Sequence, residues 1–252
     1  MEKTTRKRVV FLFKNKDNII KHIATLRKLM EKDKVVVDQL EPEDYIKGFK
    51  EFLGLKIDLS SHGGQTKRPL IPRPETEFWV GQVIKDLNKN SDVFCSSEKH
   101  HYLVLDMFCG SGCIGFAILY HVKNTRVIFA DKYKYFRNKN FVKSDVFSNI
   151  KGKFDFVFAN PPYVAIKKRH LIQKSVLQYE PKTALFGGQD GLFYIKKFLR
   201  DAIKHLNTDG VIFMEFSPEQ KKRIEELLKK YKYKGWKFHK DQFDRWRWVS
   251  IY

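Results

Sequence analysis

The feature that most constrains the fold is a regular alternation of short apolar runs and helical segments from His101 onward. Helical periodicity extends from about Cys113 to Val122 and from Pro218 to about Lys230. Strands joined by helices in this way form a mainly parallel sheet, with ligands beyond the carboxyl ends of the strands. We therefore predict an α/β fold whose strands include Tyr102–Leu105, Arg126–Ala130, Asp155–Ala159, Gly210–Phe216 and two closing runs between Phe238 and Tyr252.

The chain before this alternation has a different pattern. Apolar residues at three- and four-residue steps predict an amphipathic helix from about Asp17 to Glu31, and a second short helix is expected from Glu41 to Phe52. Alternating apolar residues followed by Ser and Gly predict a hairpin, and another helix is expected from Glu75 to about Asn88. The predicted organisation is a small helical N-terminal domain at 1–54, a hairpin linker at 55–74 and the α/β domain at 75–252.

The composition limits the partners. The chain carries 49 Lys and Arg against 29 Asp and Glu, a formal net charge of +20. This charge is consistent with a solvated basic surface or with a docking face for an acidic partner, so weak nucleic-acid affinity is an expectation. No apolar run approaches the roughly 18–20 residues that span a bilayer, so no membrane partner is expected. Three cysteines, Cys95, Cys109 and Cys113, predict neither a disulfide framework nor a metal site.

A glycine turn follows the first strand of the alternation and predicts a nucleotide site. Its glycines let the backbone approach a ligand, although a tight structural turn explains them equally well. Asp131 ends the next strand, where its carboxylate can accept hydrogen bonds from two ribose hydroxyls. A dinucleotide enzyme could use this aspartate in the same way, and an ordinary helix cap would also explain it. Asp145 and Val146 follow a third strand and offer a polar and an apolar wall for a purine. The candidate cofactor residues of the turn are Phe108, Cys109, Gly110, Ser111 and Gly112.

The tetrapeptide Asn160-Pro161-Pro162-Tyr163 ends another strand and indicates the chemistry. An amide or exocyclic amine nitrogen is a poor nucleophile because its lone pair is delocalised. The side-chain carbonyl of Asn160 and the main-chain carbonyl of Pro161 can accept its hydrogens and favour tetrahedral geometry. The prolines fix this backbone, and Tyr163 can lie against the planar group. We predict methyl transfer from a sulfonium donor to such a nitrogen.

From about Tyr45 to Tyr252 the sequence resembles the peptide-chain release factor glutamine methyltransferases. The resemblance rests on several separate segments in the family's order. They are Leu70–Glu77, Asn160–Tyr163, Glu180-Pro181, Ala184–Leu192, Glu215, Gln220, and the pair Asp241 and Arg247.

The resemblance implies a Rossmann-like class I S-adenosylmethionine methyltransferase in which Asn160 also contacts the cofactor. It implies N5-methylation of the glutamine in the Gly-Gly-Gln motif of a class I release factor, which the helical N-terminal domain would help to grip. A monomer is expected. Two positions depart from the family pattern, because Phe108 stands where the family has the first glycine of its loop and Asp244 stands at a glycine near the C-terminus.

Other functions are compatible with the same motifs. A close variant would methylate a glutamine of a ribosomal protein. A nucleic-acid amino-methyltransferase acting on rRNA or DNA uses a similar tetrapeptide and would suit the basic charge, but no separate target-recognition domain is visible. A non-catalytic binding module is a third class. The basic composition favours a mitochondrial location, with the cytoplasm as the alternative.

Overall fold

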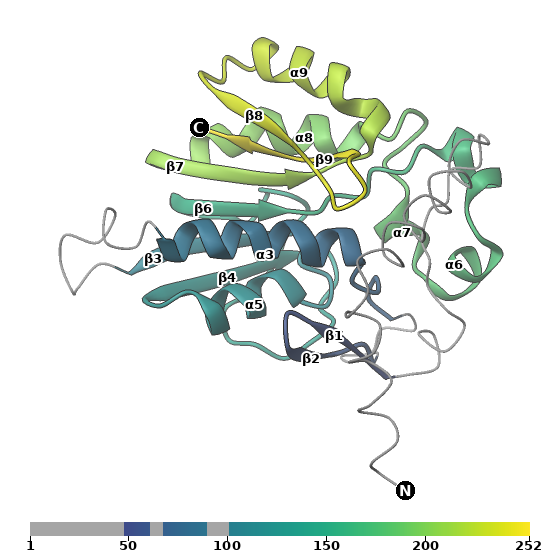
Figure 1. Ribbon diagram of the computed structural model, residues 1–252, viewed down its shortest axis with the longest axis horizontal. Helices are drawn as coiled ribbons and strands as arrows, with labels where there is room; N and C mark the ends of the chain where they lie inside the picture. The colour runs from purple at the N-terminus through teal and green to yellow at the C-terminus, as the bar shows by residue number, and fades with distance from the viewer. Residues whose placement is uncertain (1–47, 61–67, 90–100) are drawn as a thin grey trace, which may run out of the picture. The chain divides into compact units, whose positions relative to one another are not determined.

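The computed structural model describes residues 48–60, 68–89 and 101–252 (Figure 1). The elements below belong to the larger of the two units into which the chain divides, residues 40–170 and 174–252. The predicted helix from Asp17 to Glu31, most of the one from Glu41 to Phe52, and Cys95 lie outside the described residues.

The larger unit is built on a seven-stranded sheet with the strand order β5-β4-β3-β6-β7-β9-β8. Neighbouring strands from β5 to β7 pair in parallel, whereas β9 is antiparallel to both β7 and β8. This arrangement confirms the predicted α/β fold. The strands are β3 (Tyr102–Met107), β4 (Thr125–Asp131), β5 (Phe141–Lys143), β6 (Phe154–Ala159), β7 (Leu206–Glu215), β8 (Trp236–Lys240) and β9 (Trp246–Ile251).

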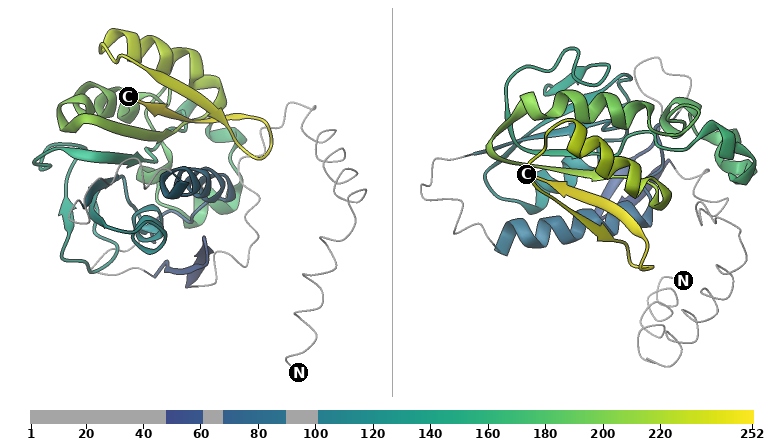
Figure 2. Two further views of the ribbon diagram at one scale, coloured as in Figure 1. Left: turned by 60° about the vertical axis from the view of Figure 1, so that its left-hand side comes forward. Right: turned by 90° about the horizontal axis from the view of Figure 1, so that it is seen from above.

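Helices cover both faces of this sheet (Figures 1 and 2). On one face lie α3 (Pro74–Lys89) and α5 (Cys113–His121), and on the other lie α8 (Phe193–Ala202) and α9 (Lys221–Lys230). In α8 the buried residues Ile195, Phe198, Leu199 and Ala202 recur at helical spacing and pack on the strands, which is the amphipathic pattern that fixes a helix to a sheet. Among the described residues, no helix is long and apolar enough to cross a membrane.

A two-stranded hairpin precedes α3 and corrects two predictions. The hairpin expected within the linker at 55–74 lies at 49–58 instead, and residues 68–73 form no strand. Phe49–Phe52 (β1) is a strand paired with Leu55–Asp58 (β2), so the helix expected from Glu41 to Phe52 does not include these four residues. Leu53 and Gly54 form the turn with φ of 48° and 78°, the left-handed backbone that a two-residue hairpin requires. Cross-strand pairing therefore overrides the local helical pattern.

The segment between β6 and β7 contains structure that the periodicity analysis did not predict. It holds a short 3-10 helix, η2 (Ile166–Leu171), followed by α6 (Lys174–Tyr179), α7 (Lys182–Leu185), α8 and η3 (Ile203–His205). Another 3-10 turn, η4 (Pro218–Gln220), leads into α9 and opens with a capping box formed by Ser217 and Gln220. The segment around α7 forms one wall of the pocket described next.

Candidate active site

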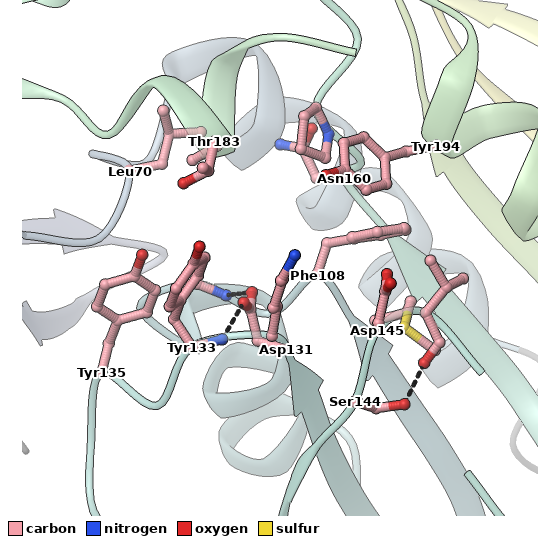
Figure 3. A pocket seen from close by; sticks show the side chains of 16 residues that line it. Leu70, Phe108, Asp131, Tyr133, Tyr135, Ser144, Asp145, Asn160, Thr183 and Tyr194 are labelled. Atoms are coloured by element: carbon pink, nitrogen blue, oxygen red, sulfur yellow. Dashed lines mark hydrogen bonds between the residues drawn. The ribbon is translucent and has the colours of Figure 1, made fainter. Parts of the chain in front are cut away.

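A pocket of about 690 Å³, including its open mouth, lies at the carboxyl ends of β3, β4 and β6 (Figure 3). This is the edge of the sheet at which the sequence predicted a ligand. Asn160 and Tyr194 lie on one side of the pocket, Asp131 and Tyr135 lie on the other, and Phe108 lies between them. The lining residues are Leu70, Met107, Phe108, Gly110, Asp131, Lys132, Tyr133, Tyr135, Ser144, Asp145, Val146, Asn160, Pro162, Thr183, Ala184 and Tyr194.

Asp131 is the last residue of β4, and backbone amides hold its carboxylate at the pocket wall. Its Oδ2 accepts a hydrogen bond from the Gly110 amide and its Oδ1 accepts one from the Tyr133 amide, both at 3.0 Å. Burial raises the pKa of Asp131, and these amide donors oppose the rise. Each oxygen keeps a lone pair for a further donor, so the carboxylate can accept two hydroxyl groups side by side.

The turn after β3 brings only part of the predicted glycine motif to the pocket. Gly110 lines it with a φ of 52°, and a Cβ there would meet nothing closer than 4.0 Å. Gly112 serves packing instead, because a Cβ would lie 2.7 Å from the Phe116 ring and 2.9 Å from the Phe136 ring. The members of the motif that do not line the pocket are Cys109, Ser111 and Gly112.

Phe108 shows what its departure from the family glycine does. Its φ is 60°, a left-handed conformation that glycine adopts without strain. The side chain lines the pocket and packs edge-on against Tyr194, with ring centroids 6.0 Å apart. An aromatic floor therefore occupies space that a glycine would leave open.

Asp145 and Val146 both reach the pocket, from the turn that follows β5. The Ser144 hydroxyl donates to the Val146 carbonyl and holds Val146 at a φ of 56°, which is unusual for a β-branched residue. Asp145 is exposed and pairs with Lys197 at 2.9 Å between Oδ2 and Nζ. The predicted apolar wall is thus rigid, and the polar wall faces solvent.

Asn160 follows β6 and connects the pocket to a buried hydrogen-bond network. Its Nδ2 donates to Thr76 Oγ1 at 3.3 Å, and the Thr76 hydroxyl donates to Glu215 Oε2 at 2.7 Å. Pro162 lines the pocket, whereas Pro161 and Tyr163 do not. The Tyr163 hydroxyl donates to Glu215 Oε1 at 2.8 Å. The Glu215 carboxylate therefore holds Tyr163 directly and Asn160 through Thr76.

The glycine-rich stretch after α7 supports the backbone of the tetrapeptide. A Cβ on Gly187 would lie 2.3 Å from the Pro162 carbonyl oxygen, and one on Gly191 would lie 2.2 Å from the Tyr163 carbonyl oxygen. The Gln220 side chain donates from Nε2 to the carbonyls of Tyr163 and Gly191, at 2.9 and 3.1 Å. These close approaches explain physically why the stretch resembling the family is built from glycines.

A buried ion pair joins two chain segments that contribute to the pocket lining. Arg73 donates twice to the Glu180 carboxylate, at 2.8 and 2.7 Å, and both side chains are buried. Arg73 lies three residues after Leu70, and Glu180 lies three residues before Thr183, which is next to Leu70 in the pocket lining (Figure 3). Periodicity and single motifs did not mark several of the lining residues, namely Leu70, Lys132, Tyr133, Tyr135, Thr183, Ala184 and Tyr194.

Asp106, which precedes the pocket-lining Met107 in β3, carries another buried carboxyl group. Its Oδ2 accepts a hydrogen bond from the Gly115 amide at 2.9 Å, and its Oδ1 has no partner among the described residues. Burial raises the pKa of Asp106 to about 7. Burial also raises the pKa of Cys109 and Cys113, so these thiols stay protonated and serve as packing. Within the described ranges, no cluster of His, Cys, Asp and Glu could hold a metal ion.

Comparisons with known proteins establish the family of the chain. A family model described as Eco57I restriction-modification methylase matches residues 12–234. The release factor glutamine methyltransferase of Lactococcus lactis is 31% identical over 226 residues, 84% of this chain and 78% of the relative. That of Borreliella burgdorferi is 31% identical over 256 residues, 92% of this chain and 82% of the relative. This chain belongs to the release factor glutamine methyltransferase family.

Membership of the release factor glutamine methyltransferase family makes the chain a methyltransferase that uses S-adenosylmethionine as methyl donor. A solved structure of the hMettl16 catalytic domain, in complex with the MAT2A 3′UTR hairpin 6, shares the fold. It is 14% identical, covers 73% of this chain and 72% of that one, and has a TM-score of 0.54. The pocket suits this cofactor, because Asp131 keeps acceptor capacity beside a ring-lined apolar floor.

Proposed function

We propose that the protein transfers a methyl group from S-adenosylmethionine to N5 of the glutamine in the Gly-Gly-Gln motif of a class I release factor. The observation that carries the proposal is the position of Asn160, on the side of the pocket opposite Asp131 and held by buried partners. Family membership supports the choice of an amide nitrogen as acceptor.

The nucleotide end of the pocket would hold the cofactor through few contacts. Asp131 would accept the ribose hydroxyls, and Val146 with Phe108 would provide apolar surface for the purine and its neighbours. The Gly110 backbone would allow close approach. We propose no direct contact for Cys109, Ser111 or Gly112 beyond shaping this turn. When bound, S-adenosylmethionine supplies an electrophilic methyl group on a positively charged sulfur.

The other end of the pocket would position the glutamine amide. The Asn160 Oδ1 and the Pro161 carbonyl would accept its two N–H groups, so that the nitrogen lone pair points at the methyl carbon. Transfer would form one N–C bond and break the S–C bond of the donor, and the methylated nitrogen would release one proton. Tyr163 would contact the face of the planar amide while its hydroxyl remains bonded to Glu215. This mechanism needs no strong base.

One alternative keeps a specific observation in its favour. The matching family model describes a restriction-modification methylase, and the net charge of +20 suits a polyanion, so an exocyclic amine of DNA or rRNA is the second candidate acceptor. A ribosomal-protein glutamine remains a close variant of the first. The basic composition supports a mitochondrial location, and the bacterial origin of the relatives supports the cytoplasm as the alternative.

The deciding experiment measures transfer of labelled methyl from S-adenosylmethionine to purified release factor. A release factor with Gly-Gly-Ala in place of Gly-Gly-Gln, a ribosomal-protein mixture and rRNA are assayed alongside. Label on the intact motif alone is the expected result. Label on rRNA, or on ribosomal protein but not on release factor, would replace the proposal with the corresponding alternative.

A further inference from the structure

The buried Glu215, at the end of β7, receives three hydrogen bonds from groups that surround the acceptor end of the pocket. Oε2 accepts from Thr76 Oγ1 and from Trp79 Nε1, each at 2.7 Å, and Oε1 accepts from the Tyr163 hydroxyl at 2.8 Å. Glu215 is 1% exposed and Thr76 is 2% exposed, so bulk solvent does not compete for these bonds. Thr76 and Trp79 both come from the first turns of α3, far from Glu215 in sequence.

The chemistry of these groups gives the network a direction. An indole N–H can only donate, so Oε2 of Glu215 must be an acceptor. The single hydrogen of the Thr76 hydroxyl is used toward that oxygen, which leaves Thr76 Oγ1 with lone pairs only on its remaining side. The Asn160 side-chain group that faces Thr76 must therefore be its NH₂.

The opposite orientation of the Asn160 amide is disfavoured on both sides. It would set the Asn160 carbonyl oxygen against the lone pairs of Thr76 Oγ1, with no hydrogen between them. It would also present N–H groups to the pocket, where the proposed substrate nitrogen presents N–H groups of its own. Glu215 thus determines, through Thr76, which end of the Asn160 amide faces the substrate.

We propose that Glu215 and Thr76 are positioning residues that hold the Asn160 carbonyl toward the pocket and so select an acceptor nitrogen with hydrogens to donate. The inference rests on the proposed function of Asn160. Neither residue lines the pocket. Their contribution is to fix one of two amide orientations before the substrate arrives, as preorganisation requires.

Three substitutions and a control test this inference. Thr76→Val keeps the shape and removes the hydroxyl, so turnover (kcat) should fall roughly 10- to 100-fold, a loss comparable to that of a preorganised hydrogen-bonding group. The dissociation constant of S-adenosylmethionine should change less than about threefold, since Thr76 does not line the pocket. Thr76→Ser should restore most of the turnover. The matched control is Thr208→Val, an exposed position at the far end of β7.

Glu215→Gln tests whether the orientation of the hydrogen bonds or the negative charge of Glu215 is the important property. The Trp79 indole still requires an oxygen at the Oε2 position, so the Gln carbonyl should occupy it and continue to accept from Thr76. The Gln NH₂ then faces the Tyr163 hydroxyl, which can accept as well as donate. Turnover should therefore fall much less than in Thr76→Val. If a buried negative charge were the important property, Glu215→Gln would be the more damaging change, and that result would overturn the inference.

A substrate-free measurement separates this inference from the proposed function. The side-chain amide signals of Asn160 in a ¹⁵N NMR spectrum are identified by their loss in Asn160→Ala. They should show slowed hydrogen exchange in the wild type, Thr76→Ser and Glu215→Gln, and faster exchange with a shift in Thr76→Val. Unchanged signals and turnover in Thr76→Val would refute the positioning role. Wild-type protein that fails to methylate any release factor, but shows this NMR pattern, would remove the proposed substrate and leave the orientation standing.

Discussion

The two ends of the pocket are built differently around a buried carboxyl group. At the acceptor end, Glu215 receives hydrogen bonds from Thr76, Trp79 and Tyr163. At the nucleotide end, Asp106 has one amide donor and an oxygen with no partner among the described residues. The acceptor end is therefore fixed in advance by side chains, whereas the nucleotide end keeps polar capacity unused. A site that must orient a poor nucleophile benefits from the first arrangement.

The largest expected loss of turnover comes from removing the Asn160 side chain, which the hydrogen bonds at the acceptor end hold in place. Asn160→Ala should lower kcat by at least roughly 10²–10³-fold, because one preorganised acceptor is lost where the substrate nitrogen must be oriented. Cofactor affinity, measured by calorimetric titration, should stay within a few-fold of wild type, because most of the proposed cofactor surface is intact. Unchanged turnover would show that the orientation of the acceptor comes from elsewhere.

A glycine swap tests how rigid the acceptor end is. Gly191 has a φ of 75°, and a Cβ there would lie 2.2 Å from the Tyr163 carbonyl oxygen, so Gly191→Ala must displace backbone. We expect a loss of about 2–4 kcal/mol in the free energy of unfolding from overpacking and left-handed strain together. Chemical denaturation measures this loss, and turnover should fall with it.

The matched control for that swap is Gly152→Ala. Gly152 has a φ of 84° with nothing within 4 Å of a built Cβ, so only the strain of about 1–2 kcal/mol applies. Equal losses in the two variants would mean that the contact with the tetrapeptide contributes nothing.

At the nucleotide end, Asp131→Ala should weaken S-adenosylmethionine binding roughly 10- to 100-fold, the range expected for lost hydrogen bonds to a charged group. The unfolding free energy should change little by comparison, because Asp131 is only half-buried. Asp145→Ala provides the contrast, since Asp145 is exposed and already pairs with Lys197. If calorimetric titration shows a larger loss of S-adenosylmethionine affinity in Asp145→Ala than in Asp131→Ala, our assignment of the ribose contact is reversed.

The sequence predicted the nucleotide end better than the acceptor network, for a physical reason. Asp131 and Asn160 each end a strand, and parallel strands bring their carboxyl ends to one edge, so local pattern is enough to place both. Thr76 and Glu215 are 139 residues apart, and no period or spacing predicts that they meet. Both fall at positions that the family resemblance marked, but the resemblance did not say what they contact.

Where sequence reasoning failed, long-range pairing or unusual backbone was responsible. Phe49–Phe52 pairs with β2 instead of continuing a helix. Ile195, Phe198 and Leu199 in α8 do recur at helical spacing, whereas the short α6 and α7 carry too few residues for a periodic signal. Phe108 and Asp244, the two departures from family glycines, both have a left-handed backbone, with φ of 60° and 63°. Glycine adopts this backbone without strain, so the conformation itself explains why glycine suits both positions.

The smallest expected effect sharpens the comparison of the two carboxyl groups. Burial raises the pKa of Asp106 to about 7, far above the value near 3.9 of an unfolded chain. The folded state therefore binds more protons than the unfolded state between about pH 4 and pH 7. The contribution of Asp106 to the free energy of unfolding is thus fully present below pH 4 and is lost as the pH rises through 7.

Without added cofactor, this group should remove about 1.4 kcal/mol of unfolding free energy between pH 6 and pH 8. Asp106→Asn cannot titrate, so the difference between wild type and variant should follow that slope, while other titrating groups cancel. Denaturation curves at pH 6, 7 and 8 measure it, and parallel pH dependences in the two proteins would show that Asp106 is ionised throughout and that its free oxygen has found a partner.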